Sequence, residues 1–236
     1  MSSPVTSLDE LLAIGDDALI AAQRLAQWCS RAPEMEEDVA LANIALDQLG
    51  VARLVLSYAA EVEGAGGDED TLAYLRDDRQ FRNCLLAELP EPDFAFAIAK
   101  LLFLSAYQRL RYAALASSAD ERLAAIAAKA VKESAYHLDH ATLWTLRLGD
   151  GTEESHRRMQ HAVDELWPYT HELFEGNDLR PAWLSQVEPV LAEATLARPT
   201  DGWAPTGGRA GLHTEHLSYL LAEMQVVHRA HPGAKW

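Results

Sequence analysis

The sequence is poor in residues that interrupt or cross-link a chain. Among its 236 residues are 13 glycines, 10 prolines and two cysteines, Cys29 and Cys84. The modest glycine and proline content disfavours a fibrous or disordered class. The two cysteines lie far apart and form no C-x-x-C pair, which predicts reduced core thiols in a cytosolic protein; a disulfide is possible but not indicated.

Basic residues are also scarce. Lysine and arginine number 20 against 36 aspartates and glutamates, so the net charge is −16. Phosphate binding requires clustered Lys and Arg, so this balance argues against nucleic acid as a partner. An acidic surface indicates solubility or a basic partner protein. The first residues show neither the basic nor the apolar region of a signal peptide, and no apolar run approaches a transmembrane length, which predicts a cytoplasmic protein with no membrane partner.

What the chain does contain is alanine and leucine, with few β-branched residues, and 49% of it is hydrophobic. This composition predicts an all-α fold with a full core. Hydrophobic periodicity and capping residues predict two helical hairpins, each with a short turn: residues 8–30 with 34–62, and 93–117 with 121–148. A connecting segment with a helix at 71–86 joins the hairpins. This is the connectivity of a ferritin-like four-helix bundle with one long crossover.

The last third of the sequence is expected to form a C-terminal helical extension, about residues 152–236. It should hold three helices, the first bent at Pro168 because proline lacks a backbone donor: about 152–174, 180–197 and 213–231. With the bundle core, about 8–148, the extension is predicted to form one ferritin-like domain over residues 1–236.

The predicted helix at 34–62 is apolar on nearly all sides except for one polar seam. Glu36, Asn43, Asp47 and Gly50 succeed one another by steps of seven, four and three residues, so they share one stripe. A polar seam inside an otherwise buried helix is where a helical bundle builds a site. The seam therefore predicts a metal site or the remnant of one.

The ligand pattern of a di-iron bundle is incomplete. Such bundles place Glu-x-x-His on one helix of each hairpin. In the second helix Asp47 stands at the carboxylate position and Gly50 at the histidine position. The fourth helix allows two alignments with this pattern. If Glu133 is the carboxylate, Tyr136 stands at the histidine position; if His137 is the histidine, a serine stands at the carboxylate position. We interpret these five residues as vestigial metal-site positions and expect no metal and no catalytic residue in this chain.

A buried carboxylate on the seam would need compensation. An isolated buried charge is costly, so Asp47 is expected to have a cation or a hydrogen-bond donor beside it. Arg24 on the first helix and Lys132 on the fourth are candidate cations, since either would replace the charge of the metal by an ion pair.

Histidines offer a second, weaker metal hypothesis. A mononuclear site could be drawn from two short groups on the predicted helices: His137, Asp139 and His140, and His213, Glu215 and His216. Solvated or capping histidines are the more common finding and are the favoured interpretation.

The loop before the last helix contains Gly207, Gly208 and Arg209. Such a loop at a helix N-terminus can hold an anion. A tight turn between packed helices explains the same glycines and is favoured.

Long blocks of the sequence resemble one known family. They span nearly the whole chain in order: L-I-A-A-Q-R-L-A-Q-W-C, E-D-V-A-L-A-N-I-A-L-D-Q-L-G-V-A-R, G-D-E-D-T-L-A-Y-L-R-D-D-R-Q-F-R-N, A-K-A-V-K-E-S-A-Y-H and T-G-G-R-A-G-L-H-T-E-H-L-S-Y-L-L-A-E-M-Q. On these blocks the chain resembles the ferritin-like proteins of phenylacetate catabolism. In that family a catalytic di-iron subunit converts phenylacetyl-CoA, with O2, to its ring-1,2-epoxide, and an NADPH-dependent reductase with FAD and an iron–sulfur centre supplies electrons.

Within the family the resemblance is to the structural partner of the catalytic subunit, which has lost the metal ligands. It implies that this chain binds and stabilises the catalytic subunit, meets the reductase and the small subunits only indirectly, and carries no cofactor itself; self-association is left open. Two alternatives stand beside this hypothesis. One is a stand-alone ferritin-like metal-dependent oxygenase, and the other is an acidic helical scaffold unrelated to oxygenation.

Overall fold

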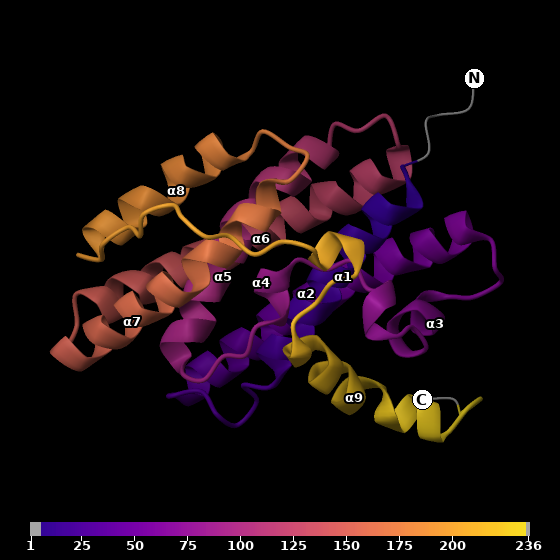
Figure 1. The fold of residues 1–236 in the computed structure, drawn as a ribbon, viewed down its shortest axis with the longest axis horizontal. Helices are drawn as coiled ribbons and strands as arrows, with labels where there is room; N and C mark the ends of the chain where they lie inside the picture. The colour runs from indigo at the N-terminus through magenta and orange to yellow at the C-terminus, as the bar shows by residue number, and fades with distance from the viewer. Residues whose placement is uncertain (1–5, 235–236) are drawn as a thin grey trace. The chain divides into compact units, whose positions relative to one another are not determined.

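The computed structural model describes residues 6–234, and its regular elements within this range are all helical, which confirms the all-α prediction. The chain divides into two compact units (Figure 1). Of the described residues, the first unit contains 6–90 and 207–234, and the second unit contains 91–206. The predicted C-terminal extension is thus shared between the units, and the single domain stays a prediction.

The first unit is built on a hairpin of α1 (Leu8–Ala26) and α2 (Met35–Glu63). Ser7 caps α1, because its side chain accepts a backbone N–H from the first turn. The first helix ends four residues before the predicted boundary, and Ser30 then takes a left-handed conformation with φ 66°. Gly64, with φ 70°, ends α2.

The two helices of this hairpin approach closely at Gly15. A Cβ at this position would lie 2.7 Å from Leu56 Cδ2 on α2, so only glycine fits without displacement. Around this contact the facing sides of both helices are buried, including Leu11, Ala18, Leu41 and Val55. Burial of these side chains supplies much of the stability of the hairpin.

The connection after the first hairpin differs from the prediction of one helix at 71–86. It consists of α3 (Glu69–Tyr74), the 3-10 turn η1 (Asp78–Gln80) and α4 (Leu85–Glu88). The charged run at 76–79, predicted to be helical, lies across the break between α3 and η1. Arg76, which lies in this break, is buried, and its guanidinium donates to Asp16 on α1 within the first unit.

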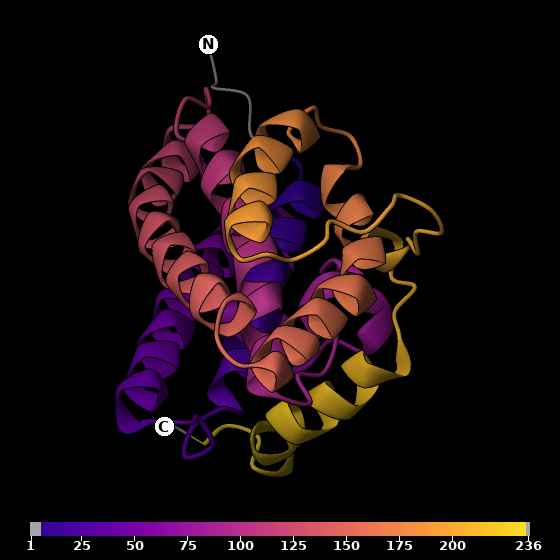
Figure 2. The ribbon, with the colours of Figure 1, turned by 90° about the vertical axis from the view of Figure 1, so that its left-hand side faces the viewer.

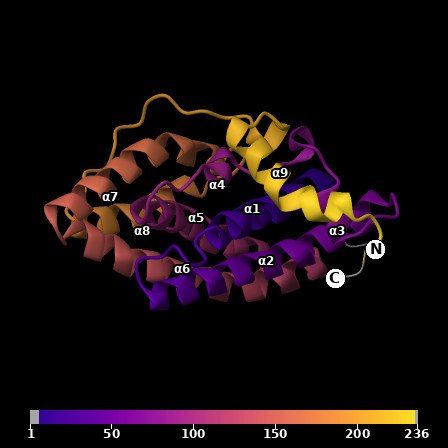
Figure 3. The same ribbon diagram turned by 90° about the horizontal axis from the view of Figure 1, so that it is seen from below.

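The same unit is completed by the end of the chain. The 3-10 turn η3 (Gly208–Ala210) leads into α9 (Glu215–Ala230), which packs against α3 and α4 (Figure 3). The helix lies within the predicted range of 213–231. Segments that lie 126 to 155 residues apart in sequence are therefore in contact within this unit.

The second unit contains the hairpin of α5 (Phe94–Leu115) and α6 (Glu121–Gly149). Asp93 and Asp120 cap the two helices, since the side chain of each accepts a backbone N–H of the first turn. With the first hairpin and the crossover, these helices have the connectivity predicted for a ferritin-like fold.

Three further elements of the second unit pack on this hairpin (Figure 2): α7 (Glu153–Leu166), η2 (Trp167–Phe174) and α8 (Arg180–Glu193). The predicted bend at Pro168 occurs as the change from α7 to the 3-10 helix η2, because proline cannot donate the next helical hydrogen bond. Trp183 is completely buried, and its Nε1 donates to the carbonyl of Phe103 at 3.0 Å. Its ring lies 5.5 Å from that of Trp167, so aromatic packing holds these elements on α5.

Candidate functional site

The predicted polar seam on α2 is not enclosed. Glu36 and Asn43 are exposed, and Asp47 and Gly50 are only half-buried. The prediction that α2 is buried on nearly all sides is therefore wrong. Its core-facing side packs on α1, while the opposite side carries exposed leucines beside the seam.

The predicted ligand positions on α6 point in different directions. Tyr136 is 75% exposed, whereas His137 is buried. Ser134, which replaces a carboxylate in the His137 alignment, donates its hydroxyl to the carbonyl one turn earlier at 2.8 Å. Glu133 forms an ion pair with Lys129 at 3.1 Å. The four positions on α6 thus do not converge on one point.

These residues do not fit a pair of iron ions. Gly50 offers no ligand atom, Tyr136 faces solvent, and the Ser134 hydroxyl is already bonded to the backbone. Between residues 6 and 234 there is no group of three or more His, Cys, Asp or Glu side chains placed to share a metal. That observation counts equally against the mononuclear histidine hypothesis. Whether the chain retains iron stays a prediction for metal analysis.

The two candidate cations occupy different environments. Arg24 is buried, and its guanidinium donates to the backbone carbonyls of Glu88 at 3.0 Å and His216 at 3.3 Å. Lys132 is exposed. Arg24 thus stabilises the attachment of the last helix, a role that the sequence did not predict, and the partner expected for Asp47 remains a prediction.

A group of buried charges in the first unit was not predicted from the sequence. Asp16 is completely buried, and its carboxylate accepts hydrogen bonds from both terminal nitrogens of Arg76; Nη1 lies 3.0 Å from Oδ2. The backbone N–H of Arg82 donates to the same oxygen at 2.8 Å. Burial raises the pKa of the Asp16 carboxyl, and the Arg76 charge opposes that rise. The pair connects α1 to the crossover.

Its neighbour Asp17 binds the C-terminal segment. The Arg209 guanidinium donates to both Asp17 oxygens, at 2.8 and 2.7 Å, and to the carbonyl of Arg82 at 2.8 Å. Asp17 also accepts the N–H of Cys84 at 2.7 Å. The 207–209 loop forms the 3-10 turn η3 with its arginine engaged in this way. This geometry supports the turn interpretation over an anion site.

A third buried pair fixes the start of α9. His213 Nδ1 lies 2.7 Å from Glu88 Oε2, and its Nε2 lies 3.1 Å from the carbonyl of Phe81. Glu88 also accepts from Asn83 at 2.8 Å and from the N–H of Thr214 at 2.6 Å. Both ring nitrogens face oxygens, so His213 is hydrogen-bonded to Glu88 on one side and to the Phe81 carbonyl on the other. These contacts attach the start of α9 to the crossover and have a structural role.

One sequence signal could have revealed this network. Asp16 and Asp17 lie side by side in the middle of a helix that is apolar on most sides, and an arginine-rich run follows in the crossover. Buried carboxylates require cations, so the adjacent aspartates and the arginine-rich run together predict buried ion pairs between the first helix and the crossover.

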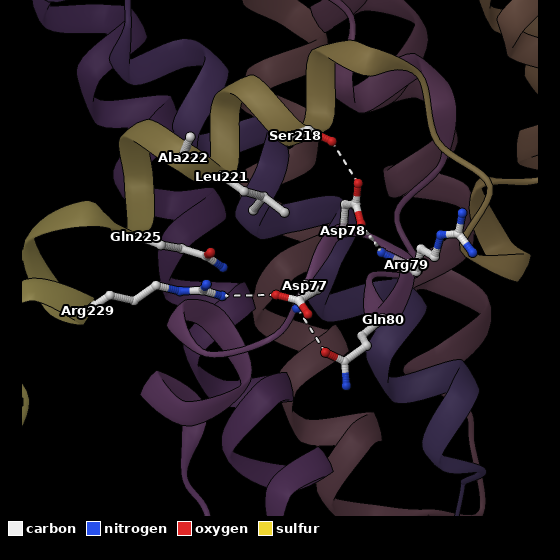
Figure 4. A pocket seen from close by; sticks show the side chains of 9 residues that line it. All are labelled: Asp77, Asp78, Arg79, Gln80, Ser218, Leu221, Ala222, Gln225 and Arg229. Carbon is white, nitrogen blue, oxygen red and sulfur yellow. Dashed lines mark hydrogen bonds and ion pairs between the residues drawn. The ribbon is translucent and has the colours of Figure 1, made fainter.

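A hollow of about 450 Å³ lies where α9 meets η1 (Figure 4). Three of its four charged side chains have partners in the same hollow: Ser218 donates to Asp78 at 2.7 Å, and Arg229 approaches Asp77 at 3.5 Å. Gln225 donates to the carbonyl of Arg76 at 3.0 Å. These contacts attach α9 to the crossover, which explains the polar lining without a ligand.

The exposed side of α2 carries a row of apolar side chains. Met35 is 80% exposed, Val39 56%, Leu46 63% and Leu49 44%. Among the described residues α2 is the one helix long and apolar enough to cross a membrane by length and composition, contrary to the expectation that no run approaches that length. A core helix of a soluble protein meets the same criterion, and α2 packs on α1.

Comparison with known proteins connects these observations to a family. Residues 3–236 match the model of the PaaA/PaaC family, described as phenylacetic acid catabolic protein. The chain belongs to the phenylacetic acid catabolic protein family. The family resemblance carried by the sequence blocks is thereby confirmed.

Among curated members of the phenylacetic acid catabolic protein family, the chain is similar to one of the subunits of 1,2-phenylacetyl-CoA epoxidase, the one designated C, from Escherichia coli (strain K12). The two are 48% identical over 241 residues, covering 95% of this chain and 97% of the relative. The similarity therefore includes both units, the crossover and α9. Family membership also agrees with an all-α ferritin-like fold.

Proposed function

We propose that this chain is the non-catalytic structural subunit of a multicomponent phenylacetyl-CoA epoxidase, and that it binds and stabilises the catalytic subunit in the cytoplasm. The observation that carries the proposal is the 48% identity, over nearly the full length of both chains, to a protein named as a subunit of that enzyme. A protein named as one subunit implies others.

The local geometry supports a role without chemistry in this chain. The positions where a di-iron bundle needs carboxylates and histidines hold Gly50, Ser134 and an exposed Tyr136. Ligand number and type decide which metal a site binds, and these residues supply neither. The residues that hold buried charge, such as Asp16 and Glu88, are already satisfied by protein groups.

In the proposed complex, oxygen chemistry belongs to the iron of the catalytic subunit. One atom of O2 enters the phenyl ring as the 1,2-epoxide and the other leaves as water, with NADPH as the electron source through FAD and an iron–sulfur centre in the reductase. This chain contributes no catalytic group and no cofactor. It acts by binding the catalytic subunit and stabilising its folded form.

The test is co-expression with a homologue of the catalytic, di-iron subunit, followed by purification through a tag on this chain and iron counting on each separated protein. We expect the catalytic subunit to co-purify, with iron found on it and none on this chain. Purified alone, this chain should form no epoxide from phenylacetyl-CoA, O2 and reductant.

Two results would overturn the proposal. Stoichiometric iron and epoxidation by the isolated chain would establish a stand-alone oxygenase. Failure of the catalytic subunit to co-purify, with both proteins folded by circular dichroism, would establish an acidic scaffold unrelated to oxygenation.

A further inference from the structure

The apolar residues on the exposed side of α2 follow a regular spacing. Met35, Val39, Ala42, Leu46 and Leu49 succeed one another by alternating steps of four and three residues, and we name them the α2 stripe. Such spacing places side chains on one face, as in the contact face of a coiled coil. Fourteen residues at 1.5 Å per residue give the stripe a length of about 21 Å.

The α2 stripe lies outside the core of the first unit. The side of α2 that packs on α1 is formed by other buried residues, among them Leu41, Ile44 and Val55. Single exposed leucines are ordinary, but four large exposed apolar side chains on one face of a helix, Met35, Val39, Leu46 and Leu49, mark a binding surface.

A hollow continues the α2 stripe toward the C-terminal end of the helix. It measures about 320 Å³ and is formed by α1, α2 and α3, with Leu49 and Leu56 on one side and Tyr74 on the other. Leu49 belongs to both features. A hollow of this size beside an apolar row suits a large side chain from an approaching helix.

Acidic residues surround this surface. Glu36 lies beside the α2 stripe, and Glu69 and Asp70 line the hollow. Arg53, the cation of the hollow, lies 3.6 Å from Glu69. The surface is therefore apolar at its centre and negative at its edge, on a chain of net charge −16.

This charge pattern selects among possible occupants. A second copy of the chain would bring two acidic edges together, which costs free energy. A membrane with anionic lipids would also repel the surface, since interfacial helices that bind such lipids carry Lys and Arg on their polar side. A helix with an apolar face and flanking Lys or Arg complements both the α2 stripe and its edge.

We propose that the α2 stripe and the adjoining hollow are the docking surface for an apolar helix, flanked by lysine or arginine, of another protein of the complex. This inference rests on the proposed function and assigns that helix to the catalytic subunit. Large apolar side chains in the centre set the lifetime of the complex, and the acidic edge sets its rate of association.

The experiment measures binding of the full-length chain to the immobilised catalytic subunit by surface plasmon resonance. Leu46→Ser should raise Kd at least tenfold, and Leu46→Ser with Leu49→Ser at least a hundredfold. Leu46 is 63% exposed and Leu49 44%, so the thermal midpoint of each variant should stay close to that of the unmodified chain. Val226→Ser, which removes an apolar side chain that is 56% exposed on α9, is the matched control and should leave Kd unchanged.

The charge requirement is measured separately. The association rate of the unmodified chain should fall as NaCl rises from 50 to 500 mM, and Glu36→Gln with Glu69→Gln should reduce that dependence. Binding to the catalytic subunit that survives the double leucine variant would overturn the inference while the proposed function stands. An association rate that is insensitive to salt would also overturn it. The inference would likewise fail if the same leucines were needed for self-association or for vesicle binding instead. If the unmodified chain does not bind the catalytic subunit, the proposed function itself fails and the inference falls with it.

Discussion

In the first unit the returning C-terminal segment is attached to α1 and the crossover by buried ion pairs, whereas in the second unit the segment after α6 is attached to α5 by aromatic rings. Asp17 with Arg209 and Glu88 with His213 represent the first kind of attachment. Trp183 against Phe103 and Trp167 represents the second. Aromatic burial tolerates changes of pH and salt, while buried ion pairs need both partners present and correctly protonated. The stability of the first unit should therefore depend more on pH and on the loss of single charged partners, and that of the second unit on the loss of buried aromatic rings.

The largest effect is expected in the aromatic attachment. Trp183→Ala removes a completely buried ring and strands the carbonyl of Phe103, so the free energy of unfolding should fall by about 3–5 kcal/mol. Urea unfolding followed by circular dichroism measures this change. Trp203, which is 73% exposed, provides the matched control, and its replacement by alanine should cost far less. Equal losses at both positions would remove the basis for the comparison.

A smaller loss is expected from breaking one ion pair. Arg209→Ala leaves Asp17 without its guanidinium, and because Arg209 is partly exposed we expect about 2–3 kcal/mol of destabilisation. Adding Asp17→Asn to the same chain should restore part of that loss, because it removes the uncompensated charge. A double-mutant cycle measures the coupling, and strictly additive losses would contradict a direct pair.

Helix packing within the first hairpin offers a third test. Gly15→Ala would place a Cβ 2.7 Å from Leu56 Cδ2, and we expect a cost of about 1–3 kcal/mol. Gly50→Ala on α2, where no atom lies within 4 Å of the new Cβ, should instead stabilise the chain by about 0.5–1 kcal/mol. Thermal unfolding of both variants compares them, and a stabilising Gly15→Ala would show that close approach is not required.

The smallest effect is a change in acid sensitivity. Hydrogen bonds from Arg180, Trp167 and Arg198 hold the pKa of Asp201 well below its usual 3.8. A lowered folded pKa gives stability that is complete above pH 3.8 and is lost as the pH falls through the folded value. Asp201 is 39% exposed, so we expect at most about 1 kcal/mol. The difference in unfolding free energy between the unmodified chain and Asp201→Asn should shrink from pH 7 to pH 3, and a constant difference would refute this.

Asp16 in the first unit differs from Asp201 in the second unit, because its pKa is shifted in the opposite direction. Burial raises the folded pKa above 3.8, so its contribution to stability falls as the pH rises from 3.8 toward that raised value. The first unit should therefore show a titration of opposite sign from that of Asp201 in the second unit.

Much of the helical framework follows from local chemistry. Apolar periodicity with caps such as Ser7 and Asp120 predicts the four long helices, because these signals act within one or two turns. The pairing of Arg76, in the break of the crossover, with Asp16 does not follow, since the two residues lie sixty positions apart in sequence. The same limit concealed the roles of Arg209 and His213, which are defined by distant carboxylates.

The α2 helix could not be predicted correctly for a different reason. An apolar pattern is the same whether the residues pack in the core of their own chain or in an interface with another protein. The pattern therefore predicts that Leu46 and Leu49 are buried, although both are exposed in this chain. The incomplete ligand pattern, by contrast, is evident from the sequence, because a glycine at position 50 has no side chain that could bind a metal in any fold.

The wide separation of Asp17 and Arg209, 192 residues, also has a consequence for biosynthesis. At roughly 5–20 residues per second, a ribosome needs about 10–40 s to deliver Arg209 after Asp17 has emerged. The second unit is continuous in sequence and is complete before residue 207 emerges, so it can finish folding first. Throughout that interval Asp17 on α1 lacks its guanidinium partner and the α2 stripe is uncovered. The nascent chain is therefore most vulnerable to aggregation in its earliest-made part, where a chaperone or an early encounter with a partner would have the greatest effect.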